Sequence, residues 1–245
     1  MNNFTKRVLS TTILLPLVFY IIISGSYLLI FFNIFVFLLA IYEWNAMSKN
    51  KKYKIFGFLF LIFSFFCFYK ISRDLVEVFF VILVCVSTDI GGYIFGKIFK
   101  GPRLTKISPN KTYAGMIGSY VLSLTSVLTI SNFIDYHAPT IIIIFLIIMI
   151  STISQLGDII ISYFKRLAHI KNSGNIIPGH GGLLDRIDGI IFAIPSSYLF
   201  KSLTNTLRAG KLTPAASVGV AHKHTSKRFL KAFSISVLCE CINPA

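Results

Sequence analysis

The sequence predicts an all-α, polytopic integral membrane protein with about seven transmembrane helices joined by polar loops. Of its 245 residues, 55% are hydrophobic and only 13% are charged, and the mean hydropathy is +0.75. This composition differs from that of soluble domains, and long apolar stretches recur along the chain. The net charge is +15, but the cations lie in short blocks between apolar stretches. That placement is typical of membrane topology and contact with lipid headgroups, and it argues against nucleic acid as a partner.

The predicted spans are apolar stretches separated by basic loops or short polar turns. The first follows Lys6 and Arg7. We interpret it as an uncleaved span rather than a signal peptide, because no clear cleavage pattern follows and a second apolar stretch begins at once. About 20 apolar residues cross a bilayer core, so several spans fit in this chain. In chain order the predicted spans cover residues 8–23, 27–47, 55–69, 75–99, 113–134, 140–164 and 187–203.

The cations are concentrated in three loops. Residues 49–54, 97–111 and 165–186 carry nearly all Lys and Arg of the first 200 residues, whereas the intervening loops carry few. Under the positive-inside rule, these three loops and the N-terminus are cytoplasmic. The polar chemistry of the chain is therefore expected to face the cytoplasm.

The C-terminal segment departs from this pattern. Residues 1–204 are predicted to form one membrane-embedded domain, and residues 205–245 an atypical basic tail. An odd number of spans places this tail opposite the basic loops, which conflicts with the positive-inside rule. Two interpretations stay open: the tail lies outside the functional fold, or it is an ordinary variable tail with an eighth span near residues 229–239.

Two aspartates lie within predicted spans. An aspartate at a bilayer centre costs about 2.5–3.5 kcal/mol, so Asp89 and Asp158 are expected to face a cavity, a partner or an ion. An interfacial position near the headgroups is the alternative. Asp89, Gly92 and Gly96 share one helix face, and the spacing of the two glycines permits close helix approach. The sequence therefore predicts that Asp89 lies at a helix–helix seam.

Residues 157–188 gather most of the remaining ionisable groups. Asp158, Ser162 and Lys165 fall on one helix face, and Asp185 and Asp188 are three residues apart at the start of the last span. Magnesium binds oxygen ligands and uses one or two carboxylates together with substrate phosphates. These aspartates therefore predict a magnesium site. The alternative is that Asp185 and Asp188 form an acidic first turn favoured by the helix dipole.

Two polar loops have the composition of phosphate-binding sites. Ser108, Lys111 and Thr112 offer a cation and two hydroxyls around a proline-fixed turn. Gly181 and Gly182 lie in a glycine-rich stretch whose backbone can approach a ligand closely and form an anion-binding nest. Nucleotide or lipid phosphates suit both loops. The alternative, basic loops that only set topology, does not account for the glycines.

Several segments together resemble one known family. Residues 162–166 read Ser-Tyr-Phe-Lys-Arg, and residues 178–188 read Pro-Gly-His-Gly-Gly-Leu-Leu-Asp-Arg-Ile-Asp. This pair of segments closely resembles the signature of phosphatidate cytidylyltransferases (CDP-diacylglycerol synthases). Residues 89–96 and 108–112 resemble two further segments of that family, in the same order. The resemblance covers about residues 5–204.

The resemblance implies an integral membrane enzyme of a bacterial-type inner (plasma) membrane. Its reaction makes CDP-diacylglycerol and pyrophosphate from CTP and phosphatidic acid, with Mg2+ as cofactor and a homodimer as the compatible assembly. The implied catalytic residues are Asp158, Asp185, Lys165, Arg166 and His180, and the implied metal ligands are Asp158, Asp185 and Asp188. Substrate binding is implied for Asp89, Ser108, Lys111, Thr112, Ser162, Lys171, Gly181, Gly182 and Arg186.

The chain departs from the family pattern at three places. Ile161 and Asn172 stand where the family usually has acidic residues, and Tyr113-Ala114 stands where it usually has a Trp-Glu pair. Two other functions therefore stay open at this stage. One is a non-catalytic membrane homologue, and the other is a cation or proton transporter that uses Asp89 and Asp158 as carriers.

Overall fold

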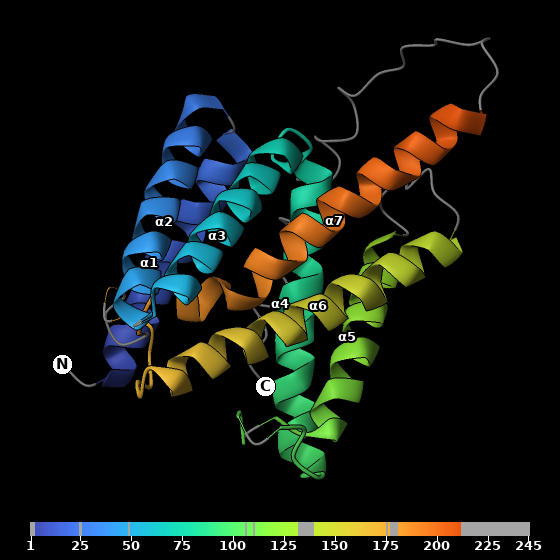
Figure 1. The fold of residues 1–245 in the computed structure, drawn as a ribbon. Helices are drawn as coiled ribbons and strands as arrows, with labels where there is room; N and C mark the ends of the chain where they lie inside the picture. The colour runs from blue at the N-terminus through green and yellow to red at the C-terminus, as the bar shows by residue number, and fades with distance from the viewer. Residues whose placement is uncertain are drawn as a thin grey trace.

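The computed structural model describes residues 3–24, 26–48, 50–105, 107–109, 111–131, 140–174, 176 and 181–211. Within these ranges the chain forms seven α-helices and no β-strand, which confirms the predicted all-α class (Figure 1). The helices are α1 (Asn3–Ser24), α2 (Ser26–Met47), α3 (Lys51–Ile71), α4 (Leu75–Phe99), α5 (Tyr113–Ser131), α6 (Thr140–Leu167) and α7 (Leu184–Lys211).

Each predicted span corresponds to one helix, and α4 has the predicted bounds. The differences lie at the helix ends, where polar residues continue a helix beyond its apolar part. Helix α6 extends three residues past residue 164, and α7 begins three residues before residue 187 and continues to Lys211. Residues 212–245, which hold most of the predicted tail, lie outside the described residues. The domain boundary after residue 204 therefore stays a prediction.

Among the described residues, four helices are long and apolar enough to cross a membrane: α2 from Tyr27 to Met47, α3, α4 and α6. Shorter apolar helical segments cover Thr12–Ser24 and Tyr113–Thr129. The chain is thus a helical membrane protein by length and composition. The number of spans stays a prediction.

The helices form three groups (Figure 1). Helices α1, α2 and α3 stand side by side, α4 pairs with α5, and α6 and α7 cross the molecule obliquely between these groups. The α4–α5 and α6–α7 contacts are the most extensive. Helices α6 and α7 therefore connect the α1–α3 group with the α4–α5 pair, and both carry predicted site residues.

Glycines allow the α4–α5 pair to pack at very short range. A Cβ atom at Gly91 would lie 2.5 Å from the carbonyl oxygen of Gly118, and one at Gly115 would lie 2.7 Å from the carbonyl oxygen of Gly92. Neither position leaves room for a side chain, since both neighbouring atoms belong to the backbone. The close approach expected from Gly92 and Gly96 is confirmed.

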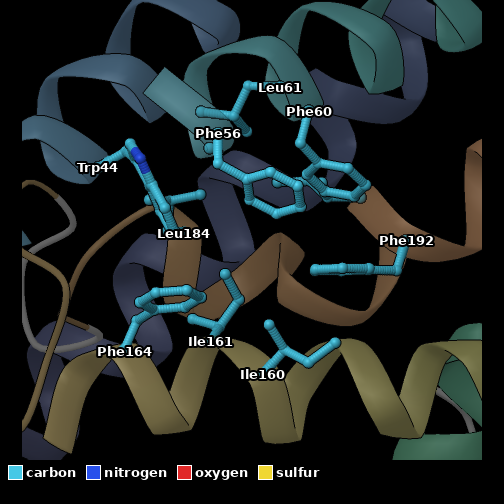
Figure 2. Close-up of a pocket in the computed structure, with 11 residues that line it drawn as sticks. Trp44, Phe56, Phe60, Leu61, Ile160, Ile161, Phe164, Leu184 and Phe192 are labelled. Carbon is cyan, nitrogen blue, oxygen red and sulfur yellow. The ribbon is translucent and has the colours of Figure 1, made fainter. Parts of the chain in front are cut away.

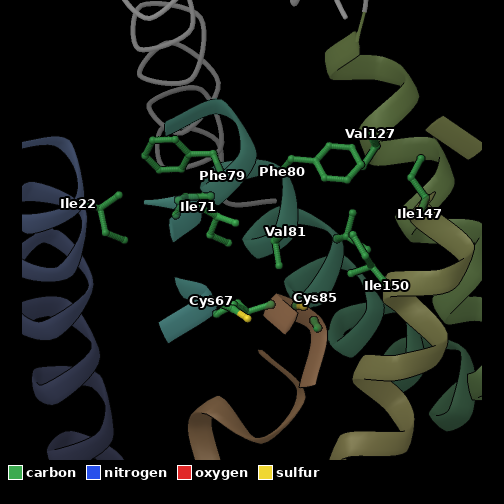
Figure 3. Close-up of a cluster of buried hydrophobic side chains, with 14 of the residues drawn as sticks. Ile22, Cys67, Ile71, Phe79, Phe80, Val81, Cys85, Val127, Ile147 and Ile150 are labelled. Carbon is green, nitrogen blue, oxygen red and sulfur yellow. The ribbon is translucent and has the colours of Figure 1, made fainter. Parts of the chain in front are cut away.

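The larger hydrophobic core contains buried residues from all seven helices, with the largest share from α4 (Figure 3). Val84 and Ile147 are fully buried there, together with the free thiols Cys67 and Cys85. Hydrogen bonds cross the same region, including Thr88 Oγ1 to Ser151 Oγ at 2.9 Å. In an apolar medium such bonds remove the cost of buried hydroxyl groups, so the core fixes both the packing and the register of α4 against α6.

A charged cluster joins the beginning of α4 to the second half of α7. The Lys201 ammonium contacts Asp74 Oδ2 at 3.1 Å and also pairs with the buried Glu77. Ser197 Oγ donates a hydrogen bond to Glu77 as well, at 3.4 Å. Ionisable groups within membrane helices are costly unless they pair with one another, and this cluster ties α7 to α4.

Candidate functional site

The basic segments at the start of α3 and before α5 both contact α6. The ring of Tyr53, at the start of α3, lies 5.6 Å from the ring of Phe164, near the end of α6. The Lys111 ammonium, in the loop before α5, lies 3.3 Å from the Gln155 carbonyl oxygen of α6. These contacts bring the first two basic loops to the half of α6 that precedes the third, and a shared membrane face for all three loops stays a prediction. Which side of the membrane they face stays a prediction.

Lys111 and Asp158 form the first ion pair of the site. The Lys111 Nζ atom lies 2.5 Å from Asp158 Oδ2, and the two side chains are 24% and 31% exposed. The loop before α5 holds Lys111 in place, because its N–H donates to the Ser108 carbonyl at 3.1 Å and its carbonyl accepts from Leu104 N–H at 2.7 Å. On α6, Ser162 Oγ donates to Asp158 Oδ1 at 3.4 Å. The sequence placed Asp158 and Ser162 on one helix face, and the structure confirms this.

Aspartates from three helices surround this pair. The carboxyl group of Asp188 on α7 lies against that of Asp158 on α6. Asp89 on α4 is exposed and lies within electrostatic range of both Asp158 and Lys111. Asp89 therefore lies near the polar site, and its predicted position at a helix–helix seam stays a prediction. Two carboxyl groups in contact require a proton or a cation between them.

Lys165 and Asp185 form the second ion pair, across the loop between α6 and α7. Their Nζ and Oδ1 atoms are 2.9 Å apart, and the side chains are only 13% and 10% exposed. The other carboxylate oxygen of Asp185 accepts the N–H groups of Ser173 at 2.9 Å and Gly182 at 3.1 Å. Gly181 has a φ of 87°, which only glycine adopts without strain. The loop is therefore folded around the Asp185 carboxylate.

The surroundings of Asp185 determine its protonation. Burial alone would raise the pKa of Asp185, but the hydrogen bonds from Lys165, Ser173 and Gly182 and the charge of Lys165 outweigh it and hold the pKa below 3.8. The pair then stabilises the fold at every pH above about 3.8, and this contribution is lost as the pH falls through the lowered pKa of the folded state.

We therefore predict a pH-dependent difference in stability between the wild type and Asp185→Asn. Near neutral pH the wild type unfolds at the higher temperature in detergent, because only it has the ionised pair. The difference is constant down to about pH 5 and closes below the ordinary carboxyl pKa. Thermal unfolding of both proteins across this range is the measurement. A difference that persists or grows in acid would contradict an ionised, stabilising Asp185.

Glu43 is a site residue that the sequence reasoning did not identify. It lies on α2, is fully buried, and accepts three hydrogen bonds. These come from Ser173 Oγ, Leu183 N–H and Leu184 N–H, each at 2.8 Å. The last two donors are orphan N–H groups at the beginning of α7, which a carboxylate suits well. An ionisable residue within a predicted span was the available signal, and the cost argument used for Asp89 applies to it equally.

Glu43 also explains two of the glycines in the loop. A Cβ atom at Gly174 would lie 2.6 Å from Glu43 Oε1, and one at Gly182 would lie 2.6 Å from Glu43 Oε2 and 2.0 Å from Ser173 Oγ. The N–H groups of residues 182–184, part of the predicted anion nest, thus point at carboxylates of the protein itself. These glycines make room for Glu43, and a direct phosphate contact from Gly181 or Gly182 stays a prediction.

The other predicted residues lie around the two ion pairs. Thr112 Oγ1 accepts the N–H of Gly115 at 3.1 Å and so caps the start of α5, and Ser108 helps to form the turn that holds Lys111. Arg166, Lys171 and Arg186 are exposed. His180 lies outside the described residues.

The departures from the family pattern have different surroundings. Ile161 is 4% exposed and packs in the second hydrophobic cluster with Trp44, Leu61 and Leu184. An apolar residue suits that position, since every one of these neighbours is apolar. Asn172 is exposed and packs beside Gly181.

Few side chains that could bind a metal ion lie close together in the part of the chain that the structure describes. There, no group of three or more Asp, Glu, His or Cys residues is arranged to hold a metal. The contacting carboxyls of Asp158 and Asp188 fit magnesium, which needs only one or two carboxylates when substrate phosphates complete its shell. Asp185 is bound to Lys165 and backbone N–H groups instead, and its metal role stays a prediction.

Comparisons with known proteins point in one direction. The model of the cytidylyltransferase family matches residues 53–204, which contain both ion pairs. A phosphatidate cytidylyltransferase of Staphylococcus saprophyticus is 41% identical over 125 residues, covering 51% of this chain and 48% of that protein. Proteins of the same name from Staphylococcus epidermidis and Staphylococcus aureus are 35% identical over 161 residues, covering 62% of each chain.

The matched region therefore spans about half to three fifths of the curated relatives. The range matched by the family model includes Asp89, Lys111, Asp158, Lys165 and Asp185, whereas Glu43 lies before it. The family model covers more than half of the 245 residues. The chain belongs to the cytidylyltransferase family.

Proposed function

We propose that this protein transfers CMP from CTP to phosphatidic acid, giving CDP-diacylglycerol and pyrophosphate. The observation that carries the proposal is the pairing of two lysines with two aspartates, Lys111–Asp158 and Lys165–Asp185, at one end of a bundle of apolar helices. Family membership and the similarity to phosphatidate cytidylyltransferases support it. A membrane-embedded site suits this reaction, because one substrate is a lipid and the other is soluble.

The reaction balances without an added oxidant or reductant. A phosphate oxygen of phosphatidic acid attacks the α-phosphorus of CTP, and the bond from that phosphorus to the oxygen bridging to the β-phosphate breaks. Pyrophosphate leaves with that bridging oxygen. Because the nucleophile is already an anion near neutral pH, no strong base is required. Binding, alignment and charge stabilisation are therefore the main tasks of the protein.

The two ion pairs place cations where phosphates would bind. Asp158 and Asp185 hold the ammonium groups of Lys111 and Lys165 in fixed positions, and Arg166 is exposed beside them. A preorganised donor aimed at developing negative charge is worth about 3–4 kcal/mol of transition-state stabilisation. We assign Lys111, Lys165 and Arg166 to the triphosphate and lipid phosphate. Ser162 positions Asp158 through its hydrogen bond.

We further propose that Mg2+ is the cofactor. The Asp158 and Asp188 carboxyls, which contact each other, would hold it. When bound, it would supply Lewis-acid stabilisation of phosphoryl oxygens. The proposal also places the basic loops in the cytoplasm, where CTP is available, in accordance with the positive-inside rule.

The proposal is tested with purified protein, CTP labelled in cytidine, phosphatidic acid and magnesium. Label is expected in the lipid extract. Asp185→Asn is expected to lower the rate about 10²-fold, because it frees Lys165 from its fixed position. Asp74→Asn is the matched control, since Asp74 lies partly exposed in the charged cluster with Lys201, where a pair contributes about 0–1 kcal/mol.

The outcomes separate the competing functions. If neither the full chain nor a form ending at residue 211 gives a labelled lipid, the chain is a non-catalytic homologue or a transporter, and the proposal is wrong. If Asp185→Asn retains full activity, Asp185 has no part in the site. Equal losses in the Asp185 and Asp74 variants would show that the effect is on folding.

A further inference from the structure

An apolar cavity of about 180 Å³ lies between α2, α3, α6 and α7 (Figure 2). Its inner wall consists of the buried side chains of Trp44, Leu61, Ile161, Leu184 and Ile191. In Figure 2, aromatic and aliphatic side chains from all four helices point into this space. A cavity of about 150 Å³ with such a lining stays dry and accepts apolar ligands, so this one suits a hydrocarbon and excludes CTP.

Two lining residues lie at the outer surface of the helix bundle. Phe56 on α3 is 67% exposed, and Ile160 on α6 is 39% exposed. Both helices are apolar and long enough to span a membrane. The cavity is therefore reached from the side that lipid chains occupy, between α3 and α6.

The cavity adjoins the candidate site directly. Ile161, Phe164 and Leu184 line it, and the next residue after each is Ser162, Lys165 or Asp185, all of which are site residues. Helices α6 and α7 thus each carry residues that line the cavity immediately before residues of the candidate site. A ligand with an apolar chain and a polar head can contact both at once.

Basic residues neighbour several of the lining residues in the sequence. Lys165 and Arg166 follow Phe164 on α6, and the N-terminal turn of α3 carries Lys51, Lys52 and Lys54 just before Phe56. The edge-to-face contact between the rings of Tyr53 and Phe164 brings these two segments together. An anionic headgroup is favoured next to such a cluster, by about 1 kcal/mol for each nearby cation.

We propose that this cavity holds the headgroup-proximal part of one acyl chain of the phosphatidic acid substrate, with its phosphate at Lys165 and Arg166. This inference rests on the proposed function. The surrounding bilayer is as apolar as the cavity, so the chain gains little free energy by entering it. The cations supply affinity, and the cavity sets the position of the lipid phosphate relative to the site.

Trp44 provides the test, because it lines the cavity and is the single tryptophan of the chain. The purified protein is placed in phosphatidylcholine bilayers that contain a small fraction of lipid brominated in the half of each chain nearest the headgroup. Bromine quenches tryptophan fluorescence on contact. Brominated phosphatidic acid is expected to occupy the cavity roughly fivefold or more in preference to brominated phosphatidylcholine, and to quench Trp44 correspondingly more. CTP is omitted, so no turnover is needed.

A variant pair tests the location. Ile160→Phe narrows the cavity entrance and is expected to reduce the quenching by phosphatidic acid. Ile148→Phe, on the same helix and similarly exposed but outside the cavity, is expected to leave it unchanged. Equal quenching by the two brominated lipids in the wild type would overturn the proposal, and so would equal quenching in the two variants. The comparison of lipids in the wild type does not depend on how well either variant folds.

The same preparations are assayed for the labelled lipid product, which separates this inference from the proposed function. A wild type that makes the product without selective quenching has the proposed activity but no acyl chain in this cavity. A wild type that shows selective quenching without making the product binds phosphatidic acid there, and only the proposed activity fails.

Discussion

Asp158→Asn is expected to reduce kcat for CDP-diacylglycerol formation by about 10³-fold, at the upper end of the losses seen when one preorganised charge-stabilising group is removed. Asp158 contacts groups on three different segments, Lys111 before α5, Ser162 on α6 and Asp188 on α7. The substitution removes the charge that fixes the Lys111 ammonium and one of the two carboxyls suited to magnesium. The labelled-lipid assay measures the rate, and intact purification of the variant shows that it folds.

A double-mutant cycle with Lys111→Met tests whether this pair acts as a unit. Residues in direct contact show coupling energies of about 0.5–3 kcal/mol. The double variant is therefore expected to be less impaired than the product of the two single effects. If the losses of kcat in the two single variants simply multiply in the double variant, the Lys111–Asp158 pair does not act as a unit. If Asp158→Asn keeps a kcat within a few-fold of the wild type, Asp158 does not contribute to the reaction as proposed.

Glu43→Gln is expected to impair both stability and activity, although Glu43 is hydrogen-bonded to none of the predicted substrate-binding residues. The amide retains one acceptor oxygen but points an NH2 group at N–H donors of the α7 terminus. A buried donor left without a partner costs about 1–3 kcal/mol. The same loop supplies the Ser173 and Gly182 N–H groups to Asp185. A small shift of this loop therefore moves Asp185 and, with it, the paired Lys165. Misplacement of a catalytic group by about 1 Å costs up to 10²-fold in rate.

Thermal unfolding in detergent and kcat in the labelled-lipid assay measure the two effects of Glu43→Gln. Ser173→Ala is the graded comparison, because it removes only one of the three hydrogen bonds to Glu43. It is expected to show a smaller loss in both measurements. If Glu43→Gln matches the wild type in stability and rate, Glu43 does not organise the loop.

The helices were predictable because each is coded by a long apolar stretch, and bilayer thickness sets its length. Helix α4 has the predicted bounds, whereas the start of α7 was placed three residues late. Its first turn contains the polar Asp185 and Arg186, so hydropathy does not indicate it. What begins the helix is the Glu43 carboxylate, which accepts the N–H of Leu184.

The sequence predicted which residue types form the site, but it did not predict which of these residues contact each other. Helical phase correctly grouped Asp158 with Ser162, since both lie on α6. It carries no information on contacts between segments, such as Lys111 with Asp158 or Lys165 with Asp185, because these depend on how helices and loops pack. Asp185 was assigned to a metal from its clustering with other ionisable groups and from the family resemblance. The structure shows it bound to Lys165 and two backbone N–H groups, and its metal role stays a prediction.

Glu43 was missed for the same reason. Its partners are 130 to 141 residues away in the sequence, and no local pattern links α2 to the loop before α7. The glycines of that loop were recognised as unusual, but their role was assigned to a ligand. The structure places the Glu43 carboxylate in the space that side chains at residues 174 and 182 would need.

The fate of two labels on CTP is the most direct test of the proposed nucleotidyl transfer. Purified full-length protein is incubated with phosphatidic acid, magnesium and CTP that carries radioactive phosphorus in either the α or the γ position. The account predicts that the α label enters the lipid extract and that the γ label appears in pyrophosphate. Entry of the γ label into lipid, or the absence of both labels from lipid, would contradict it.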